Sequence, residues 1–197
     1  QTIKLRNKTL QVPIIQGGMG VGVSLGNLAG HVAKCGGMGV ISTAHTGYRC
    51  DDFWQNFLED NLTEIKNEIQ KLKKEKDAVI LAHYYVDGEV QEIADYVGDS
   101  YYLAEIATKV PESTIIFCGV SFMGESAKIL NPKKRVVMAD GHADCPMAHM
   151  VDVDKIREVR NEYPDVSVVC YVNSTAEIKA ESDVCVTSSN ALKIVKN

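Results

Sequence analysis

Most apolar stretches after residue 77 are followed directly by polar side chains that can move protons or donate hydrogen bonds. His83 and Tyr85 come just after the apolar run 78–82. The later residues of this kind are Asp140, His142, Cys145, Tyr171, Asn173, Thr187 and Ser188. If the apolar runs are parallel strands, their carboxyl ends share one edge of a sheet, where ligands bind. The sequence therefore predicts that these side chains face one crevice.

His83 has two interpretations. A histidine at the end of a buried strand can simply be satisfied by backbone groups. Alternatively, it donates a hydrogen bond to a carboxylate or carries a proton. Tyr85 offers a second titratable hydroxyl only two residues away, which favours the functional interpretation.

Ser100 and Ser188 both precede expected helices. Serine is a common helix N-cap, so a structural role accounts for each of them. A helix N-terminus also attracts phosphate and carboxylate, so the same serines suit an anionic ligand. Tyr171 and Asn173 lie two apart on an expected strand and hence on one face. A polar face on a core strand predicts contact with a ligand.

Cys145 lies in the segment HADCPMAH, between His142 and His149. One cysteine and two histidines suggest a zinc site, but the spacing H-x2-C-x3-H is not a usual zinc pattern and a fourth ligand is not evident. The sequence by itself leaves the role of Cys145 open between a metal ligand and a small packing residue.

Apolar runs and amphipathic segments alternate from residue 78 onward, which predicts an α/β fold of parallel sheets with helices on both faces. A helix over 62–77 precedes them. The expected strands are 78–83, 114–119, 135–139, 167–172 and 183–187. The expected helices are 89–97, 101–109, 122–130, 152–162, 174–181 and 189–196.

The composition narrows the class of protein. The 197 residues carry a formal charge of −5, which argues against a nucleic-acid-binding surface. No apolar run has the length of a membrane span and no signal peptide is recognisable, so we expect no membrane contact and a cytoplasmic location. The six cysteines form no close pair, which is unlike a disulfide scaffold.

Several ordered motifs resemble quinolinate synthase, from about Leu62 to the end of the chain. They are AHYY, EVQEIADYVGDS, FCGVSFMGESAKILNP, CPMA, YVNSTAEIKAESD and TSSNA. The resemblance implies an enzyme of NAD biosynthesis, a transferase of αβα domains that condenses iminoaspartate with dihydroxyacetone phosphate to form quinolinate. It also implies a functional link to an aspartate oxidase or dehydrogenase that produces iminoaspartate.

The same resemblance assigns roles to individual residues. It implies catalytic roles for His83 and Tyr85, with His83 also facing the product's carboxylates. Substrate contacts are implied for Ser100, Tyr171, Asn173 and Ser188. Cys145 of CPMA is implied to be one of three cysteine ligands of a 4Fe–4S cluster, whose open iron acts as a Lewis acid. The motifs of the other two ligands lie beyond Asn197, so we expect Cys118 and Cys185 to pack as apolar residues.

The first sixty residues resemble a different family. The stretch VPIIQGGMGVGVSLGNLAGHVAKCGGMGVISTAHTGYR is similar to the opening of a nitronate monooxygenase, a flavin-binding (β/α)8 barrel. The expected elements are a strand over 12–15, a helix over 25–35 and a strand over 38–42. The resemblance implies that Gln16–Gly20 contact FMN, but without the later strands of the barrel we expect no flavin site.

These expectations combine into a three-part chain: a β-α-β barrel fragment (1–61), a first quinolinate synthase-like domain (62–150) and the start of a second (151–197). The sequence begins with Gln and ends inside an expected helix, so we expect a fragment that is inactive by itself. Two alternatives remain, an FMN-dependent nitronate monooxygenase and a non-catalytic truncated fusion.

Overall fold

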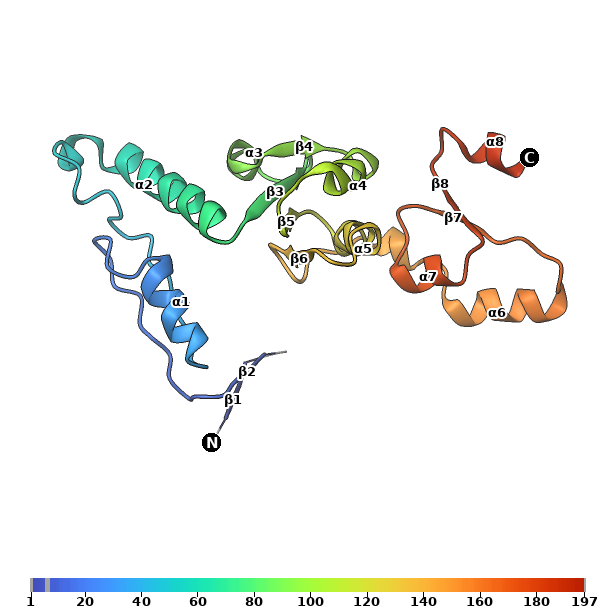
Figure 1. The fold of residues 1–197 in the computed structure, drawn as a ribbon, viewed down its shortest axis with the longest axis horizontal. Coiled ribbons are helices and arrows are strands. Elements are labelled where there is room, and N and C mark those ends of the chain that lie inside the picture. Colours follow the sequence, from blue (N-terminus) through green and yellow to red (C-terminus); the bar gives the residue numbers. More distant parts are fainter. Residues whose placement is uncertain (1, 6–7, 197) are drawn as a thin grey trace. The chain divides into compact units, whose positions relative to one another are not determined.

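The computed structural model describes residues 2–5 and 8–196. The chain divides into two compact units, Gln1–Lys76 and Asp77–Asn197 (Figure 1). No helix in the described part of the chain is long and apolar enough to cross a membrane.

The first unit contains a hairpin and two helices. Strands β1 (Ile3–Leu5) and β2 (Lys8–Leu10) pair antiparallel, and helices α1 (Gly26–Lys34) and α2 (Phe53–Glu75) follow. The Gly26 amide donates to Glu68 Oε1 (3.0 Å), which joins the start of α1 to α2. A Cβ at Gly26 would lie 2.7 Å from a Leu72 methyl group and 2.9 Å from Glu68 Oε1, so a larger residue there would require these side chains to shift.

The expected β-α-β fragment is not confirmed as two strands. In place of two paired strands, the structure has a single parallel bridge between Ile15, which precedes α1 in the sequence, and Met38, which follows it. Ile14 and Ile15 are more than half exposed, so among the described residues no strand or helix covers them fully. A parallel ladder without further strands gains too little burial to extend.

Helix α2 starts nine residues before the expected position. Phe53, its first residue, is 2% exposed and packs edge-on against His45 (5.7 Å between ring centres) and Tyr48 (5.9 Å). This aromatic cluster anchors a first turn that the apolar periodicity of residues 62–77 did not indicate. Asn56 has non-helical dihedral angles, and the helix is kinked there.

The second unit is built on a four-stranded parallel sheet in the order β4-β3-β5-β6. The strands are β3 (Ala78–His83), β4 (Tyr96–Gly98), β5 (Thr114–Cys118) and β6 (Arg135–Met138). The connecting helices are α3 (Gly88–Ile93), α4 (Ser100–Lys109) and α5 (Ser121–Leu130).

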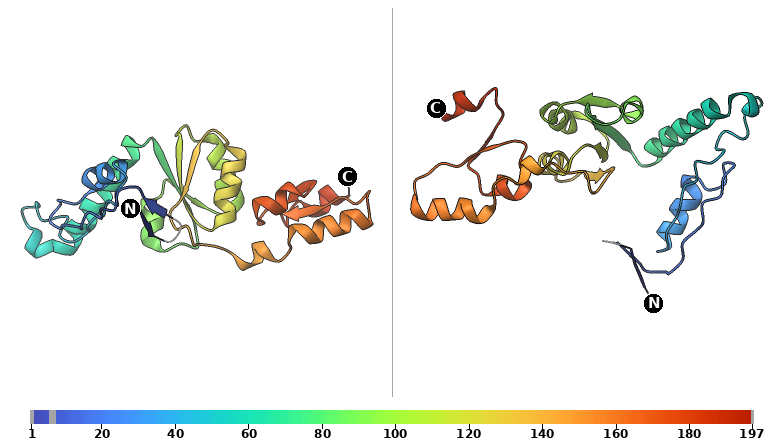
Figure 2. Two further views of the ribbon diagram at one scale, coloured as in Figure 1. Left: turned by 90° about the horizontal axis from the view of Figure 1, so that it is seen from below. Right: turned by 180° about the vertical axis from the view of Figure 1, so that it is seen from behind.

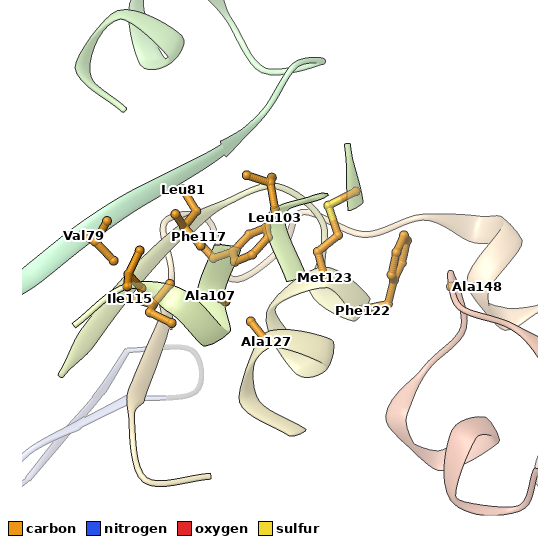
Figure 3. Packing of buried hydrophobic residues seen from close by; sticks show 11 residues of the cluster. Val79, Leu81, Leu103, Ala107, Ile115, Phe117, Phe122, Met123, Ala127 and Ala148 are labelled. Carbon is orange, nitrogen blue, oxygen red and sulfur yellow. The ribbon is translucent and has the colours of Figure 1, made fainter. Parts of the chain in front are cut away.

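Helices cover the sheet as the α/β pattern predicts. Helices α4 and α5 lie on one face of the sheet (Figure 2), and alternate residues of β3 and β5 pack against them there (Figure 3). From β3 the chain passes through α3 to β4 on one side, and from β4 it crosses back over β3 to β5 on the other side. Because these crossovers have the same hand, α3 lies on the face of the sheet opposite to α4 and α5. The main cluster is Val79, Leu81, Leu103, Ala107, Val110, Ile115, Phe117, Phe122, Met123, Ala127 and Ala148.

Strand β4 corrects the expected helix over 89–97. Helix α3 ends at Ile93, and the chain turns into a strand that pairs Tyr96 with Leu81. Asp95 is held from both sides, because its amide donates to Ile80 O (2.9 Å) and its Oδ2 accepts from Ile80 N (2.8 Å). Pairing with β3 overrides the local helical preference.

A smaller parallel pair completes the second unit. A 3-10 helix, η1 (Pro146–His149), leads to α6 (Val153–Glu162). Strands β7 (Val169–Tyr171) and β8 (Val184–Val186) pair in parallel around α7 (Ala176–Ala180), and α8 (Ala191–Val195) follows. Ile156, Cys170 and Ile178 form its core.

Candidate functional site

The strand order creates a site at the carboxyl end of β3. Strand β3 lies between β4 and β5, and the two connections diverge there, which is the position where open α/β sheets bind ligands. A cavity of about 1100 Å³ opens at this point. Its lining includes nine residues singled out from the sequence: His83, Tyr85, Ser100, Asp140, Cys145, Tyr171, Asn173, Thr187 and Ser188. His142, which was also expected there, is not among the lining residues.

His83 is held as a neutral ring with a defined tautomer. It ends β3, is only 7% exposed, and its Nδ1 accepts a hydrogen bond from the Tyr85 amide (3.2 Å). An accepting Nδ1 places the proton of the neutral ring on Nε2. Burial lowers the pKa of His83, and the carboxylate of Asp99 opposes this only in part. His83 therefore offers an Nε2–H donor at the cavity.

The two tyrosines that follow enclose this imidazole. The Tyr84 ring stacks on His83 (4.5 Å, 27°) and the Tyr85 ring meets it edge-on (4.6 Å, 71°). Tyr85 is 83% exposed, so its phenol is open to a ligand. A hydrogen bond with Tyr85 raises the pKa of Tyr84. Tyr84 also lines the cavity and was not among the expected site residues.

Ser100 does not cap its helix. The N-cap of α4 is Asp99, whose Oδ1 accepts from the Tyr102 amide (2.8 Å). The Ser100 hydroxyl instead donates to Asn173 Oδ1 (3.0 Å), across 73 residues of sequence. The capping interpretation of Ser100 was therefore wrong. The preference of N-cap positions for Asp over Ser is slight, and only the structure decides between neighbours.

Asn173 and Tyr171 reach the cavity from the end of β7. Because Asn173 Oδ1 accepts from Ser100, its amide nitrogen remains a donor for a ligand. Tyr171 is half-exposed. Ser188 is an exposed residue in the turn after β8, the strand that pairs with β7. The N-cap position of α8 is Asn190, so Ser188 is not the cap either; Asn190 makes no side-chain cap bond to the helix, and its Oδ1 accepts from Thr187 N (2.7 Å) in the preceding turn.

Asp144 organises the loop that carries Cys145. One oxygen of Asp144 accepts from Ser121 Oγ (2.7 Å) and from the Cys145 amide (2.8 Å), and the other meets His149 Nε2 (2.8 Å). These contacts, the Ser121 hydroxyl first, lower the pKa of Asp144. His149 is thus engaged with a carboxylate, and the described residues form no group of three or more metal-binding side chains.

The charge of the cavity wall is unusual for an anion site. Asp87, Asp99 and Asp140 line it, and none of its described lining residues is lysine or arginine. An anionic ligand must therefore rely on hydroxyl, amide and imidazole donors. The amides of the first turn of α4 lack intrahelical acceptors, and Asp99 takes that of Tyr102.

The family is decided by comparison with known sequences. The profile described as quinolinate synthetase A protein (NadA) matches residues 67–197. The chain belongs to the quinolinate synthetase A family.

Three relatives show the extent of this similarity. The chain is 70% identical over 131 residues to the quinolinate synthase of Fusobacterium nucleatum, covering 66% of the chain and 44% of the relative. It is 55% identical over 136 residues to that of Caldicellulosiruptor bescii (69% and 45%). It is 58% identical over 134 residues to that of Clostridium perfringens strain ATCC 13124 (68% and 44%). The chain thus spans less than half the length of these quinolinate synthases.

The match to the quinolinate synthetase A family starts at residue 67. It gives no support to the expected nitronate monooxygenase segment or to FMN as a cofactor.

Whether the cavity fits the 4Fe–4S cluster of the family depends on the thiolates that its lining residues provide. Cys145 is partly exposed there, whereas Cys118 is buried, and burial raises the pKa of the Cys118 thiol. A cubane cluster needs three or four thiolates, so the described residues do not fit it by themselves.

Proposed function

We propose that this cavity serves quinolinate synthesis, the condensation of iminoaspartate with dihydroxyacetone phosphate with loss of phosphate and water. The observation that carries the proposal is the convergence of nine side chains from distant parts of the chain on one cavity. The membership of residues 67–197 in the quinolinate synthetase A family supports it.

His83 and Tyr85 are proposed as the catalytic pair. The Nε2–H of neutral His83 donates to a carboxylate of substrate or product. The exposed phenol of Tyr85 exchanges protons during enolisation and ring closure. Because burial lowers the pKa of His83, its ring stays a neutral donor and does not trap an anionic product as an ion pair.

Substrate holding is proposed for four further residues. Ser100 and Ser188 supply hydroxyls to the phosphate, with the free amides at the start of α4. Asn173 donates through its amide nitrogen, since Ser100 occupies its oxygen. Tyr171, on the same strand end, covers the substrate with a half-exposed ring.

Cys145 is proposed as the one ligand that this chain supplies to the cluster. We also propose the domain limits 62–150 and 151–197, a cytoplasmic location, and a supply of iminoaspartate by an aspartate oxidase or dehydrogenase. Residues 1–61 are proposed to be a barrel-like fragment without a flavin site, for which the parallel bridge around α1 is the supporting observation.

A chimera tests the proposal directly. Residues 67–197 replace the matching segment of the Fusobacterium nucleatum enzyme, with which they share 70% identity, and quinolinate formation from the two substrates is measured anaerobically. We expect activity within about tenfold of the parent, a loss of at least about a hundredfold for His83→Ala, and no change for Lys155→Gln on the exposed face of α6. A chimera that folds, by circular dichroism, but makes no quinolinate would overturn the proposal.

A further inference from the structure

Two cysteines face each other across the small parallel pair. Cys170 of β7 and Cys185 of β8 are partners in the strand register. Their sulfur atoms lie 3.4 Å apart, within the range of a thiol hydrogen bond. Neither the resemblance nor the candidate site gives this pair a role.

The surroundings of the two thiols differ. Cys170 is buried against Ile156 and Ile178, whereas Cys185 is exposed. Burial and the hydrogen bond with Cys170 raise the pKa of the Cys185 thiol, and the charge of Lys179 opposes this only in part. Burial also lowers the pKa of Lys179, whose ammonium contacts Ser126 Oγ (2.7 Å) and the Phe122 ring (5.9 Å). Because Cys185 is the exposed thiol, a reagent from solution reaches it first, and Cys170 is positioned to react second.

The spacing of the two strands falls within the range that a bridge needs. A disulfide needs Cα atoms about 4.4–6.8 Å apart, and neighbouring strands lie about 4.7–4.9 Å apart. Because the register makes Cys170 and Cys185 direct partners, closure needs side-chain rotation and only a small movement of two three-residue strands.

We propose that Cys170 and Cys185 are a reversible dithiol–disulfide site that accepts oxidation from a small-molecule disulfide of the glutathione type. The Cys185 thiolate attacks one sulfur of glutathione disulfide, which breaks that bond and releases one glutathione. Cys170 then attacks the Cys185 sulfur, the second glutathione leaves, and the protein disulfide forms. Two electrons and two protons pass from the protein thiols to the small disulfide, which becomes two thiols.

A disulfide between Cys170 and Cys185 would lie next to the cavity, because residues that follow both cysteines line it. Tyr171 and Asn173 follow Cys170, and Ser188 follows Cys185. A cross-link one to three residues before these side chains fixes the separation of the two strand ends. The inference stands on the thiol geometry and does not depend on the proposed function.

The test uses the whole chain in buffers of graded ratio of glutathione disulfide to glutathione. Free thiols are blocked with N-ethylmaleimide in acid, and peptides are identified by mass spectrometry. We expect a linked Cys170–Cys185 peptide lighter by two hydrogen atoms than its parts, and its loss on addition of dithiothreitol.

Variants separate the two steps. The exposed Cys185→Ser is the main variant and should leave Cys170 free of glutathione. Cys170→Ser should accumulate about ten times more glutathione on Cys185 than the parent, because the second step is lost. Cys35→Ser, at an exposed thiol of the first unit, is the control and should leave the linked peptide unchanged. Glutathione that stays on Cys185 of the parent chain, or a Cys170–Cys185 pair that remains fully alkylated, would overturn the proposal.

Discussion

At the end of β3, one backbone amide decides which nitrogen of a histidine carries its proton. The Tyr85 amide donates to His83 Nδ1, so a second proton on the ring would break that bond and charge a buried group. Burial and this hydrogen bond act in the same direction, since both disfavour the imidazolium. The negative charge of Asp99 opposes them.

The lowered pKa of His83 predicts a pH-dependent stability. The unfolded chain has a histidine pKa of about 6.5, so between that value and the lower folded pKa the unfolded state binds more protons. The stabilisation is present above about pH 6.5 and is lost as the pH falls through the folded pKa. Urea unfolding between about pH 7.5 and 5.5 should show a smaller loss of stability in His83→Gln than in the parent. An equal loss in both proteins would contradict this, and His31→Gln, at an exposed position, is the control.

At the start of α4, two adjacent residues have different roles: Asp99 caps the helix, and Ser100 contacts Asn173. Asp99 carries the cap, so Asp99→Ala should cost about 1 kcal/mol in the free energy of unfolding. Ser100→Ala should cost less than half of that, because its partner Asn173 is itself partly exposed to water. In the chimera, Ser100→Ala should have the larger effect on activity of the two substitutions, seen as a rise in the KM for dihydroxyacetone phosphate. Equal costs in urea unfolding would show that Ser100 is also a structural residue.

At the scale of elements, the sheet and the two helices α4 and α5 form one packing unit. Leu103 is fully buried against β3 and β5 (Figure 3), and Gly124 allows α5 to lie close to β6, since a Cβ there would approach Met138 Sδ. The cavity is the open end of this unit, so its geometry depends on how firmly α4 and α5 pack.

Leu103→Ala should therefore destabilise the second unit by about 2–5 kcal/mol, because it removes a buried side chain and leaves a cavity. Leu130→Ala, at the exposed end of α5, should change the free energy of unfolding by less than about 0.5 kcal/mol. Urea unfolding followed by circular dichroism measures both. A loss below 1 kcal/mol for Leu103→Ala would mean that α4 repacks freely on the sheet.

At the scale of the whole molecule, the number of metal ligands among the described residues is the relevant quantity. The described residues form no metal-binding group of three or more side chains, and Cys145 is the partly exposed thiol at the cavity. The chain also spans less than half the length of its quinolinate synthase relatives.

We therefore expect the 197-residue chain, after anaerobic reconstitution with iron and sulfide, to retain far less than one cluster per molecule. A cubane bound by a single thiolate is displaced by competing ligands. Iron and sulfide analysis after gel filtration measures this. In the chimera, Cys145→Ser should abolish the cluster and the buried Cys118→Ala should not. A near-stoichiometric cluster on the chain alone would mean that another side chain here completes the site.

The sequence by itself determined the α/β class, the parallel sheet and most of its strands. Apolar runs such as Ala78–His83 can be buried on both faces only inside a covered sheet, and the polar residues at their ends then share one edge. This simple geometry explains why residues as distant as His83 and Ser188 were expected at one cavity and are found lining it.

Tertiary structure alone decided the rest. Strand β4 forms because Asp95 and Tyr96 pair with β3, and no local pattern in the expected helix over 89–97 signals that pairing. The same holds for the hydrogen bond from Ser100 to Asn173 and for the 3.4 Å approach of Cys170 and Cys185. Each depends on a partner at least 15 residues away. Local propensity carries no information about such partners, because only the folded chain brings them together.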